Sequence, residues 1–354
     1  MKTYRTAIIG MRGIGSSLAI PPANPVLGQL VPTSHVENYA FLPETELVAV
    51  CDLVPDLLEG FQRDFGATLP DVNIYTDYRE MLSKEQIDIL SVATSDHVHA
   101  QMTIDGVDAG VKGILCEKPI ATTLADADRI IEACERADVP IIIHHNRRWE
   151  PEYQQALKLV RSGEIGELRL VTAHLGGRRA LLFRNGTHLI DLVCFFGGAD
   201  PDWLVAELDD HFRDYGPRYA DEGGREGKND PGCSAYVHFQ NGVRAFINIS
   251  KNAPQNFELE LVCETGRVRI GRHVAEVWRM SEPWQAAVSR LEPQHTTRIN
   301  LLAAIPELID MIETGRRECT SSAQDGRRAL SIILGILQSN LAGSSRIEFP
   351  IQDM

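Results

Sequence analysis

The sequence predicts a two-domain protein: an N-terminal α/β domain with a doubly wound parallel sheet, followed by an α+β domain with a large, open, mainly antiparallel sheet. Three observations predict this class. At 354 residues the chain exceeds the usual size of a single hydrophobic core. Unbroken apolar runs alternate with helical patterns in the first part, and alternating apolar and polar residues dominate the second. We therefore place the domains at residues 1–147 and 148–354.

Short apolar runs mark the strands of the first domain. Runs of this kind suit a parallel sheet, because the crossover helices cover both of its faces. The expected strands lie at residues 6–9, 46–51, 87–93, 113–116 and 139–143, and the clearest helical patterns between them lie at 55–65 and 124–137.

The second domain alternates apolar and polar residues at the period of a strand. Asn241 and Gly242 separate two such segments, and both residues tolerate the positive φ of a two-residue hairpin turn. The expected strands lie at 168–175, 204–208, 235–239, 243–249, 257–262 and 274–278. They are followed by helices at 301–313 and 325–341 and an extended piece at 347–350. The C-terminal helix could pack back on the first domain.

Composition excludes several classes of protein. The net charge of −14 and the scattered Lys and Arg argue against a nucleic-acid partner. With no signal-peptide pattern and no apolar stretch long enough to span a bilayer, we expect a cytoplasmic protein without a membrane partner. Seven cysteines without a CxxC pair indicate neither a disulfide framework nor a zinc site. The histidine pairs also lack familiar ligand spacing, so we predict no metal.

A glycine-rich turn follows the first expected strand. Residues 10–15 read Gly-Met-Arg-Gly-Ile-Gly, and bare backbone N–H groups in such a turn can receive a pyrophosphate. The dinucleotide fingerprint normally has glycine where Arg12 stands, with Gly13 beside it. We therefore predict a nucleotide-binding turn made by Gly10, Arg12, Gly13, Ile14 and Gly15.

Asp52 ends the second expected strand, where a carboxylate can accept both ribose hydroxyls and repel the extra phosphate of NADP. This predicts NAD as cofactor, with NADP disfavoured. The alternative is an ordinary strand-end carboxylate or a helix cap before Pro55. Asp52 lies 37 positions after Gly15 (52 − 15), against about twenty in the fingerprint, so an insertion must be accommodated.

Four prolines mark this insertion, at residues 20–32, and prevent a continuous helix from Gly15. A new helix is expected to begin at Thr33 or Ser34, whose hydroxyls suit an N-cap. We expect the proline-rich segment to overlie the cofactor or a subunit contact.

Several motifs together resemble the Gfo/Idh/MocA oxidoreductase family over nearly the whole chain. The most specific are Glu117-Lys118-Pro119 after an apolar strand and the later His188-x-x-Asp191. The others are the turn at 10–15, the stretch 92–94 with His97 and His99, residues 146–151, and residues 186–191.

The resemblance implies a Rossmann domain, an α+β domain and activity on sugars or cyclitols. It implies that Lys118 hydrogen-bonds the reacting hydroxyl while His188 takes or returns the proton. Asp191, one helical turn beyond, could orient the imidazole or bind the sugar. The implied cofactor contacts add Thr94, His97, His99, Glu117 and Lys118, and the implied substrate contacts are Lys118, Asn146, Arg148, Trp149, Arg184 and His188.

Two departures from the family pattern affect these expectations. Ser95-Asp96 replaces the usual Pro-Asn, which could alter the turn beside the nicotinamide pocket. Arg184 stands four residues before His188, where many relatives have aspartate. A guanidinium there could recognise a carboxylate or phosphate on the substrate, or could be an exposed loop arginine. Arg148 and Trp149 could likewise belong to a basic linker.

These residues predict an NAD-dependent oxidoreductase that transfers a hydride between nicotinamide and a secondary alcohol of a sugar or polyol. One alternative is a closed-cycle NAD-dependent glycosidase or epimerase on the same fold. Another is a sugar-sensing regulator without catalysis. Family habit implies a homodimer or homotetramer.

Overall fold

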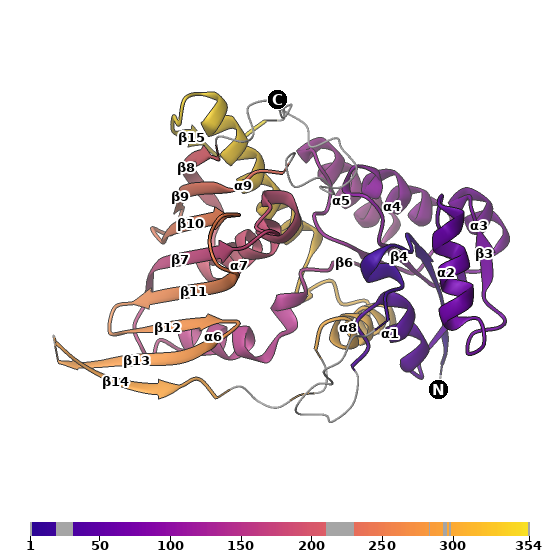
Figure 1. Cartoon of the computed structure of the whole chain (residues 1–354), viewed down its shortest axis with the longest axis horizontal. Coiled ribbons are helices and arrows are strands. Elements are labelled where there is room, and N and C mark those ends of the chain that lie inside the picture. Colours follow the sequence, from indigo (N-terminus) through magenta and orange to yellow (C-terminus); the bar gives the residue numbers. More distant parts are fainter. Residues whose placement is uncertain are drawn as a thin grey trace. The chain divides into compact units, whose positions relative to one another are not determined.

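The computed structural model of the chain describes residues 2–18, 31–209, 230–282, 284–292, 296 and 299–352 (Figure 1). The chain divides into two units. The first comprises Met1–Ala121, Asp126–Asn146 and Thr297–Ala323, and the second comprises Thr122–Ala125, Arg147–Thr296 and Gln324–Met354. Most of the proline-rich insertion, residues 20–30, lies outside the described residues.

A six-stranded parallel sheet forms the centre of the first unit, in the order β3-β2-β1-β4-β5-β6. β4 and β5 are buried throughout, as the unbroken apolar runs predicted. The strand order reverses between β1 and β4, and in doubly wound sheets ligands bind at the carboxyl ends of the strands at such a reversal. The strands are β1 (Tyr4–Ile9), β2 (Thr45–Cys51), β3 (Asn73–Tyr75), β4 (Ile89–Val92), β5 (Gly113–Cys116) and β6 (Ile141–Ile143).

Helices connect these strands. The predicted helix start after the insertion is confirmed, because Ser34 is the N-cap of α1 and forms a capping box with Glu37. The helices are α1 (His35–Phe41), α2 (Pro55–Phe65), α3 (Tyr78–Lys84), α4 (His99–Asp108) and α5 (Leu124–Ala137), with short 3₁₀ turns η1 (Gly13–Gly15) and η2 (Asp96–Val98).

One late helix, α8 (Leu301–Thr314), belongs to the first unit. It packs against β5, where Gly113 has no side chain: a Cβ there would lie 2.8 Å from Ile312 Cδ1 and 3.2 Å from Leu308 Cδ1. The predicted division had left everything after residue 147 in the second domain. The chain therefore returns to the first unit before entering the second again.

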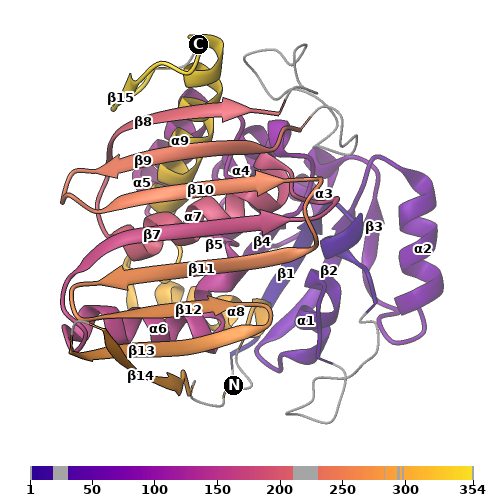
Figure 2. The same ribbon diagram turned by 60° about the vertical axis from the view of Figure 1, so that its left-hand side comes forward.

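A nine-stranded sheet dominates the second unit, in the order β14-β13-β12-β11-β7-β10-β9-β8-β15 (Figure 2). All neighbours are antiparallel except β7 and β10, which run parallel. The mainly antiparallel prediction is confirmed. The strands are β7 (Leu168–Gly176), β8 (Pro201–Leu208), β9 (Cys233–Phe239), β10 (Arg244–Ser250), β11 (Asn256–Cys263), β12 (Gly266–Gly271), β13 (Val274–Glu282), β14 (Gln285–Arg290) and β15 (Ile347–Glu348).

The predicted β9–β10 hairpin is confirmed, with Gly242 at φ +85°. β12 and β14 were not predicted. All six residues of β14 are exposed, so this strand has no buried face to impose an apolar alternation.

Helices cover one face of the nine-stranded sheet and leave the opposite face open toward the viewer of Figure 2. α7 packs on β7 and β10, and α9 packs on β8, where a Cβ at Gly335 would lie 3.0 Å from Leu204 Cδ2. The elements on the covered side are η3 (Asn146–Trp149), α6 (Pro151–Ser162), the π-helical turn η4 (Leu182–Gly186), α7 (Thr187–Gly197) and α9 (Ala323–Leu341). Among the helices in the described ranges, none has the length and apolar character that crossing a bilayer requires.

Candidate active site

The glycine turn after β1 is pressed against the end of β4. Gly10 has φ +100°, and a Cβ on it would lie 2.4 Å from the carbonyl oxygen of Ala93. A Cβ on Gly15 would meet the carbonyl of Gly10 at 2.1 Å. Gly13, in contrast, has φ +55° with open space where a Cβ would stand. The turn is thus closed on its inner side and open at Gly13, which fits the close approach of a pyrophosphate to bare backbone.

Asp52 follows β2 and braces this turn. Its Oδ2 accepts a hydrogen bond from the backbone N–H of Met11 at 2.8 Å, and its Oδ1 accepts one from that of Val54 at 2.9 Å. A carboxylate oxygen has two lone-pair directions, so each oxygen keeps one for a ribose hydroxyl. The capping and cofactor interpretations of Asp52 are therefore compatible.

Thr94 and His99 lie beyond β4 on the same edge. The Oγ1 atom of Thr94 is buried and has no hydrogen-bond partner among the described residues. The His99 ring is also buried, with Nδ1 2.9 Å from the carbonyl oxygen of Pro119 and Nε2 3.3 Å from that of Thr94. His99 therefore links the β4 and β5 ends, whereas His97 is exposed in η2. A buried hydroxyl without a partner fits a site completed by a ligand.

Glu117 follows β5 directly, and its side chain turns into the protein. Its Oε1 lies 2.6 Å from Nδ1 of His144 and 3.2 Å from Nε2 of His35. The other ring nitrogen of His35 lies 2.9 Å from Ser91 Oγ, which lies 2.6 Å from the hydroxyl of Tyr39. All five side chains are buried. Lys118 comes next in the chain, joined to Pro119 by a cis peptide bond.

In this buried cluster, neighbouring charges influence the pKa values of Glu117 and His35. Burial acts to raise the pKa of Glu117, but His144 and His35 outweigh it and hold the pKa well below its usual value. Burial lowers the pKa of His35, against the attraction of Glu117. The ligand atoms of His35, Glu117 and His144 lie within 4.8 Å of one another, a grouping that could also attract a metal ion. The distance of 2.6 Å between Oε1 of Glu117 and Nδ1 of His144 is that of a hydrogen bond.

The second unit presents Arg184 and His188 on one continuous helical segment, because η4 runs directly into α7. They are four positions apart in the sequence, so they lie about one turn apart on one side, and both are half-buried. Gly186 allows this segment to approach β10, since a Cβ there would lie 2.8 Å from Ile249 Cδ1. The π-helical turn has no signal in the sequence.

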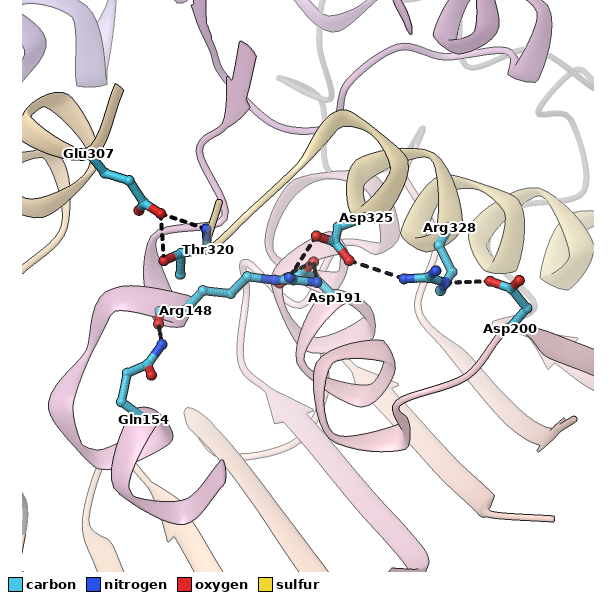
Figure 3. Close-up of polar contacts among 8 residues, drawn as sticks. All are labelled: Arg148, Gln154, Asp191, Asp200, Glu307, Thr320, Asp325 and Arg328. Atoms are coloured by element: carbon cyan, nitrogen blue, oxygen red, sulfur yellow. Dashed lines mark hydrogen bonds and ion pairs between the residues drawn. The ribbon is translucent and has the colours of Figure 1, made fainter. Parts of the chain in front are cut away.

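Asp191 lies three residues beyond His188 and forms a buried ion pair with Arg148 of η3 (Figure 3). Arg148 Nε lies 2.9 Å from Asp191 Oδ2, and Nη2 lies 2.9 Å from Oδ1. Trp149, which follows Arg148 in the sequence, is buried, and Asn146 is half-buried. The structure therefore pairs two predicted site residues with each other.

The predicted residues form two sets. In the first unit, the glycine turn, Asp52, Thr94 and Lys118 all follow carboxyl ends of strands in one sheet. In the second unit, Arg184, His188, Asp191 and Arg148 gather around the start of α7. The sequence did not indicate the partners His35, Ser91 and Asp325, because each contacts its site across a long stretch of chain.

A doubly wound unit with a glycine turn and a carboxylate at the end of β2, followed by an open-sheet α+β unit, defines a two-domain protein with a dinucleotide-binding fold. A family model described as "Oxidoreductase family, NAD-binding Rossmann fold" matches residues 4–145, and the "GFO/IDH/MocA C-terminal domain" model matches residues 153–269. The chain belongs to the Gfo/Idh/MocA oxidoreductase family, as its motifs predicted.

Individual relatives match parts of the chain. D-apiose dehydrogenase from Paraburkholderia graminis is 38% identical over 133 residues, covering 38% of this chain and 34% of the relative. Myo-inositol 2-dehydrogenase from Thermotoga maritima is 25% identical over 242 residues, covering 67% and 71%. The match thus spans about a third of the length of the first relative and about seven tenths of the second.

Among solved structures, the myo-inositol 2-dehydrogenase of Lactobacillus plantarum superposes with a TM-score of 0.71 at 22% identity, over 98% of this chain and 99% of that one. At this identity the likeness shows the fold.

Proposed function

We propose that the protein is an NAD-dependent oxidoreductase acting on a secondary alcohol of a sugar or polyol. The observation that carries the proposal is the arrangement of the first unit, where the glycine turn, Asp52 and Lys118 follow β1, β2 and β5 at one edge of a parallel sheet. Ligands of such sheets bind at this edge. The dehydrogenase names of the two curated relatives support the same class.

Each residue has a defined role in this proposal. The backbone of the glycine turn around Gly13 would hold the pyrophosphate, and Asp52 would accept hydrogen bonds from the ribose hydroxyls, which favours NAD over NADP. The chemistry that bound NAD would supply is that of a hydride acceptor for the alcohol carbon. Lys118 donates a hydrogen bond to the reacting oxygen, and His188 takes the proton that leaves this oxygen.

Arg184 would select the substrate. It is half-buried one helical turn before His188, so a group bound near the imidazole lies within reach of a guanidinium. A fork of N–H donors pairs with a carboxylate or phosphate in two parallel hydrogen bonds. We propose an anionic sugar derivative as the preferred substrate, with Asn146 and Trp149 as further contacts. In Arg184→Ala, KM should rise for sugar acids and sugar phosphates but not for neutral polyols.

Purified protein offered sugars, inositols and sugar acids with NAD or NADP tests the proposal through nicotinamide absorbance. Lys118→Ala should lose turnover while its NAD affinity, measured by calorimetry, stays within about twofold. Lys112→Ala is the matched control, because Lys112 is an exposed lysine of the same unit paired with Asp88. Unchanged turnover in Lys118→Ala would remove Lys118 from the mechanism. Product formed without net NADH would favour the closed-cycle alternative, and binding without turnover would favour the regulator.

We further propose that the open face of the nine-stranded sheet pairs with a second copy of the chain in a homodimer or homotetramer. This face holds a hollow of about 850 Å³ lined by Tyr236, Phe246, Glu258 and Arg269, among others. Phe246, one of its lining residues, is 49% exposed. A face that carries an aromatic group and charges of both signs can be self-complementary across a two-fold axis.

A further inference from the structure

Arg148 and Asp191 begin a row of alternating charges that runs from the interior of the second unit to its surface (Figure 3). Arg148 Nη1 lies 3.0 Å from Asp325 Oδ2, whose other oxygen lies 3.0 Å from Arg328 Nη1. Arg328 Nε in turn lies 2.6 Å from Asp200 Oδ1. The side chain of Asp191 is 1% exposed and that of Asp200 is 60% exposed.

This row engages all three guanidinium nitrogens of Arg148 and both carboxylate oxygens of Asp191. The guanidinium of Arg148 directs Nε and Nη2 to Asp191 and Nη1 to Asp325, and its Cζ lies 4.8 Å from the ring centre of Phe195. The side-chain amide of Gln154 donates to the backbone carbonyl of Arg148, which fixes the main chain of η3 as well. A substrate could reach either charge only after this buried pair opened.

We propose that Arg148 and Asp191 are positioning residues that hold the first turns of α7, and with them His188, instead of contacting the substrate. The inference rests on the proposed function, in which His188 handles the proton. Asp191 lies three residues after His188, and residues at this spacing share one side of a helix. Through Arg148 and Asp325, this side of α7 is tied to both η3 and α9.

The contact between Arg148 and Asp191 should also make the positioning of His188 depend on pH. Burial raises the pKa of Asp191 to about 6, although Arg148 and Arg328 oppose this shift. Asp325 on α9 adds repulsion, and Cys194 on α7 is the other titratable neighbour. Protonation of Asp191 near pH 6 would weaken its bidentate contact with Arg148, so the positioning of His188 should loosen on the acid side.

Two readouts separate positioning from contact. In Asp191→Asn, kcat should fall about 10–100-fold while KM for the alcohol and the affinity for NAD change less than about threefold. In the histidine NMR spectrum, the His188 signal, assigned with His188→Gln, should shift its position and its titration. Arg279→Met is the matched control: it removes an exposed guanidinium of the same unit, paired with Glu164 and outside this row, and should change neither readout.

The NMR readout does not require activity, so a wild-type protein inactive on every substrate would refute the proposed function and leave this inference testable. Unchanged kcat together with an unchanged His188 signal in Asp191→Asn would overturn the inference. A rise in KM with kcat intact would overturn it too, because Asp191 would then contact the substrate. Should Asp191→Asn fail to fold, Arg148→Lys keeps the charge without the fork, and the same outcomes apply.

Discussion

Oε1 of Glu117 lies 2.6 Å from Nδ1 of His144, and both side chains are buried next to the peptide that carries Lys118. His35 approaches the same oxygen at 3.2 Å from α1. The end of β5 is therefore tied to α1 and to the residue following β6. Oε1 of Glu117 is thus bound inside the first unit, and Lys118, one residue on, extends from a backbone held on one side by Glu117 and on the other by the contact of Pro119 with His99.

The contact between Glu117 and His144 should contribute strongly to stability. In His144→Phe the carboxylate loses its shortest hydrogen bond inside the protein, and we expect a loss of about 2–4 kcal/mol in the free energy of unfolding of the first unit. Hydrogen exchange of the β4 and β5 amides would measure it. His97→Gln is the control: it removes an exposed histidine of the same unit and should change stability by less than about 0.5 kcal/mol. Equal effects of the two changes would contradict the assignment.

The same cluster predicts how the first unit responds to acid. The pKa of His35 is lowered from 6.5 in the folded state, so below pH 6.5 the unfolded chain binds a proton that the folded chain refuses, and stability falls. The pKa of Glu117 is lowered from 4.5, so its contribution is present above pH 4.5 and is lost as the pH falls further. The protection of the β4 and β5 amides, calculated after correction for the intrinsic pH dependence of exchange, should therefore decrease from pH 6.5 downward. In His35→Gln the slope between pH 6.5 and 4.5 should decrease by up to about 1.4 kcal/mol per pH unit.

In the second unit, Asp191 should make the free energy of unfolding rise as the pH falls, opposite to the effect of His35 and Glu117 in the first unit. Its folded pKa of about 6 exceeds the ordinary 3.8, so the folded state takes up a proton first and gains stability as the pH falls from 6 to 4. All four tryptophans, Trp149, Trp203, Trp278 and Trp284, belong to this unit, so their fluorescence reports on it. As the pH falls from 6 to 4, the urea midpoint of the unmodified protein, measured by tryptophan fluorescence, should rise relative to that of Asp191→Asn. Parallel pH curves for the two proteins would argue against an elevated pKa.

Asp52 should control the choice of cofactor. Asp52→Asn removes the charge that would repel a 2′-phosphate and keeps an oxygen for one of the backbone N–H groups of Met11 and Val54. We expect the ratio of kcat/KM with NADP to kcat/KM with NAD to rise at least about tenfold. Asp56→Asn, which removes a carboxylate from the first turn of α2, is the control. If the unmodified protein already uses NAD and NADP equally well, the proposal that Asp52 selects NAD is wrong.

The sequence was sufficient for features that depend on local chemistry. The parallel sheet followed from unbroken apolar runs, the β9–β10 hairpin from Asn241-Gly242, and the start of α1 from Ser34. Each signal is contained in a few neighbouring residues, because glycine conformation, capping and burial period act over short distances.

Partners far apart in the sequence could not be predicted. Glu117 and His144 are 27 residues apart, and Arg148 and Asp191 are 43 apart. Their pairing depends on tertiary packing that no local pattern encodes. For this reason the sequence could only suggest that Asp191 orients the imidazole or binds the sugar and that Arg148 contacts the substrate or belongs to a basic linker, whereas the structure shows them bound to each other. The parallel contact of β7 with β10 likewise arises from sheet order, not from strand propensity.

The open face of the second sheet gives the last prediction, on assembly. Along β10, Arg244, Phe246 and Asn248 are exposed while the residues between them are buried, so one side of the strand meets solvent in the single chain. If a second copy covers this face, Phe246→Glu places a charge in the contact and should shift the mass measured by light scattering toward the monomer. Phe41→Glu is the matched control, because Phe41 is 56% exposed, close to the 49% of Phe246, and lies at the end of α1. A subunit contact centred on β10 should be disrupted by Phe246→Glu and not by Phe41→Glu. If both variants lose assembly, or if neither does, the subunit contact lies elsewhere.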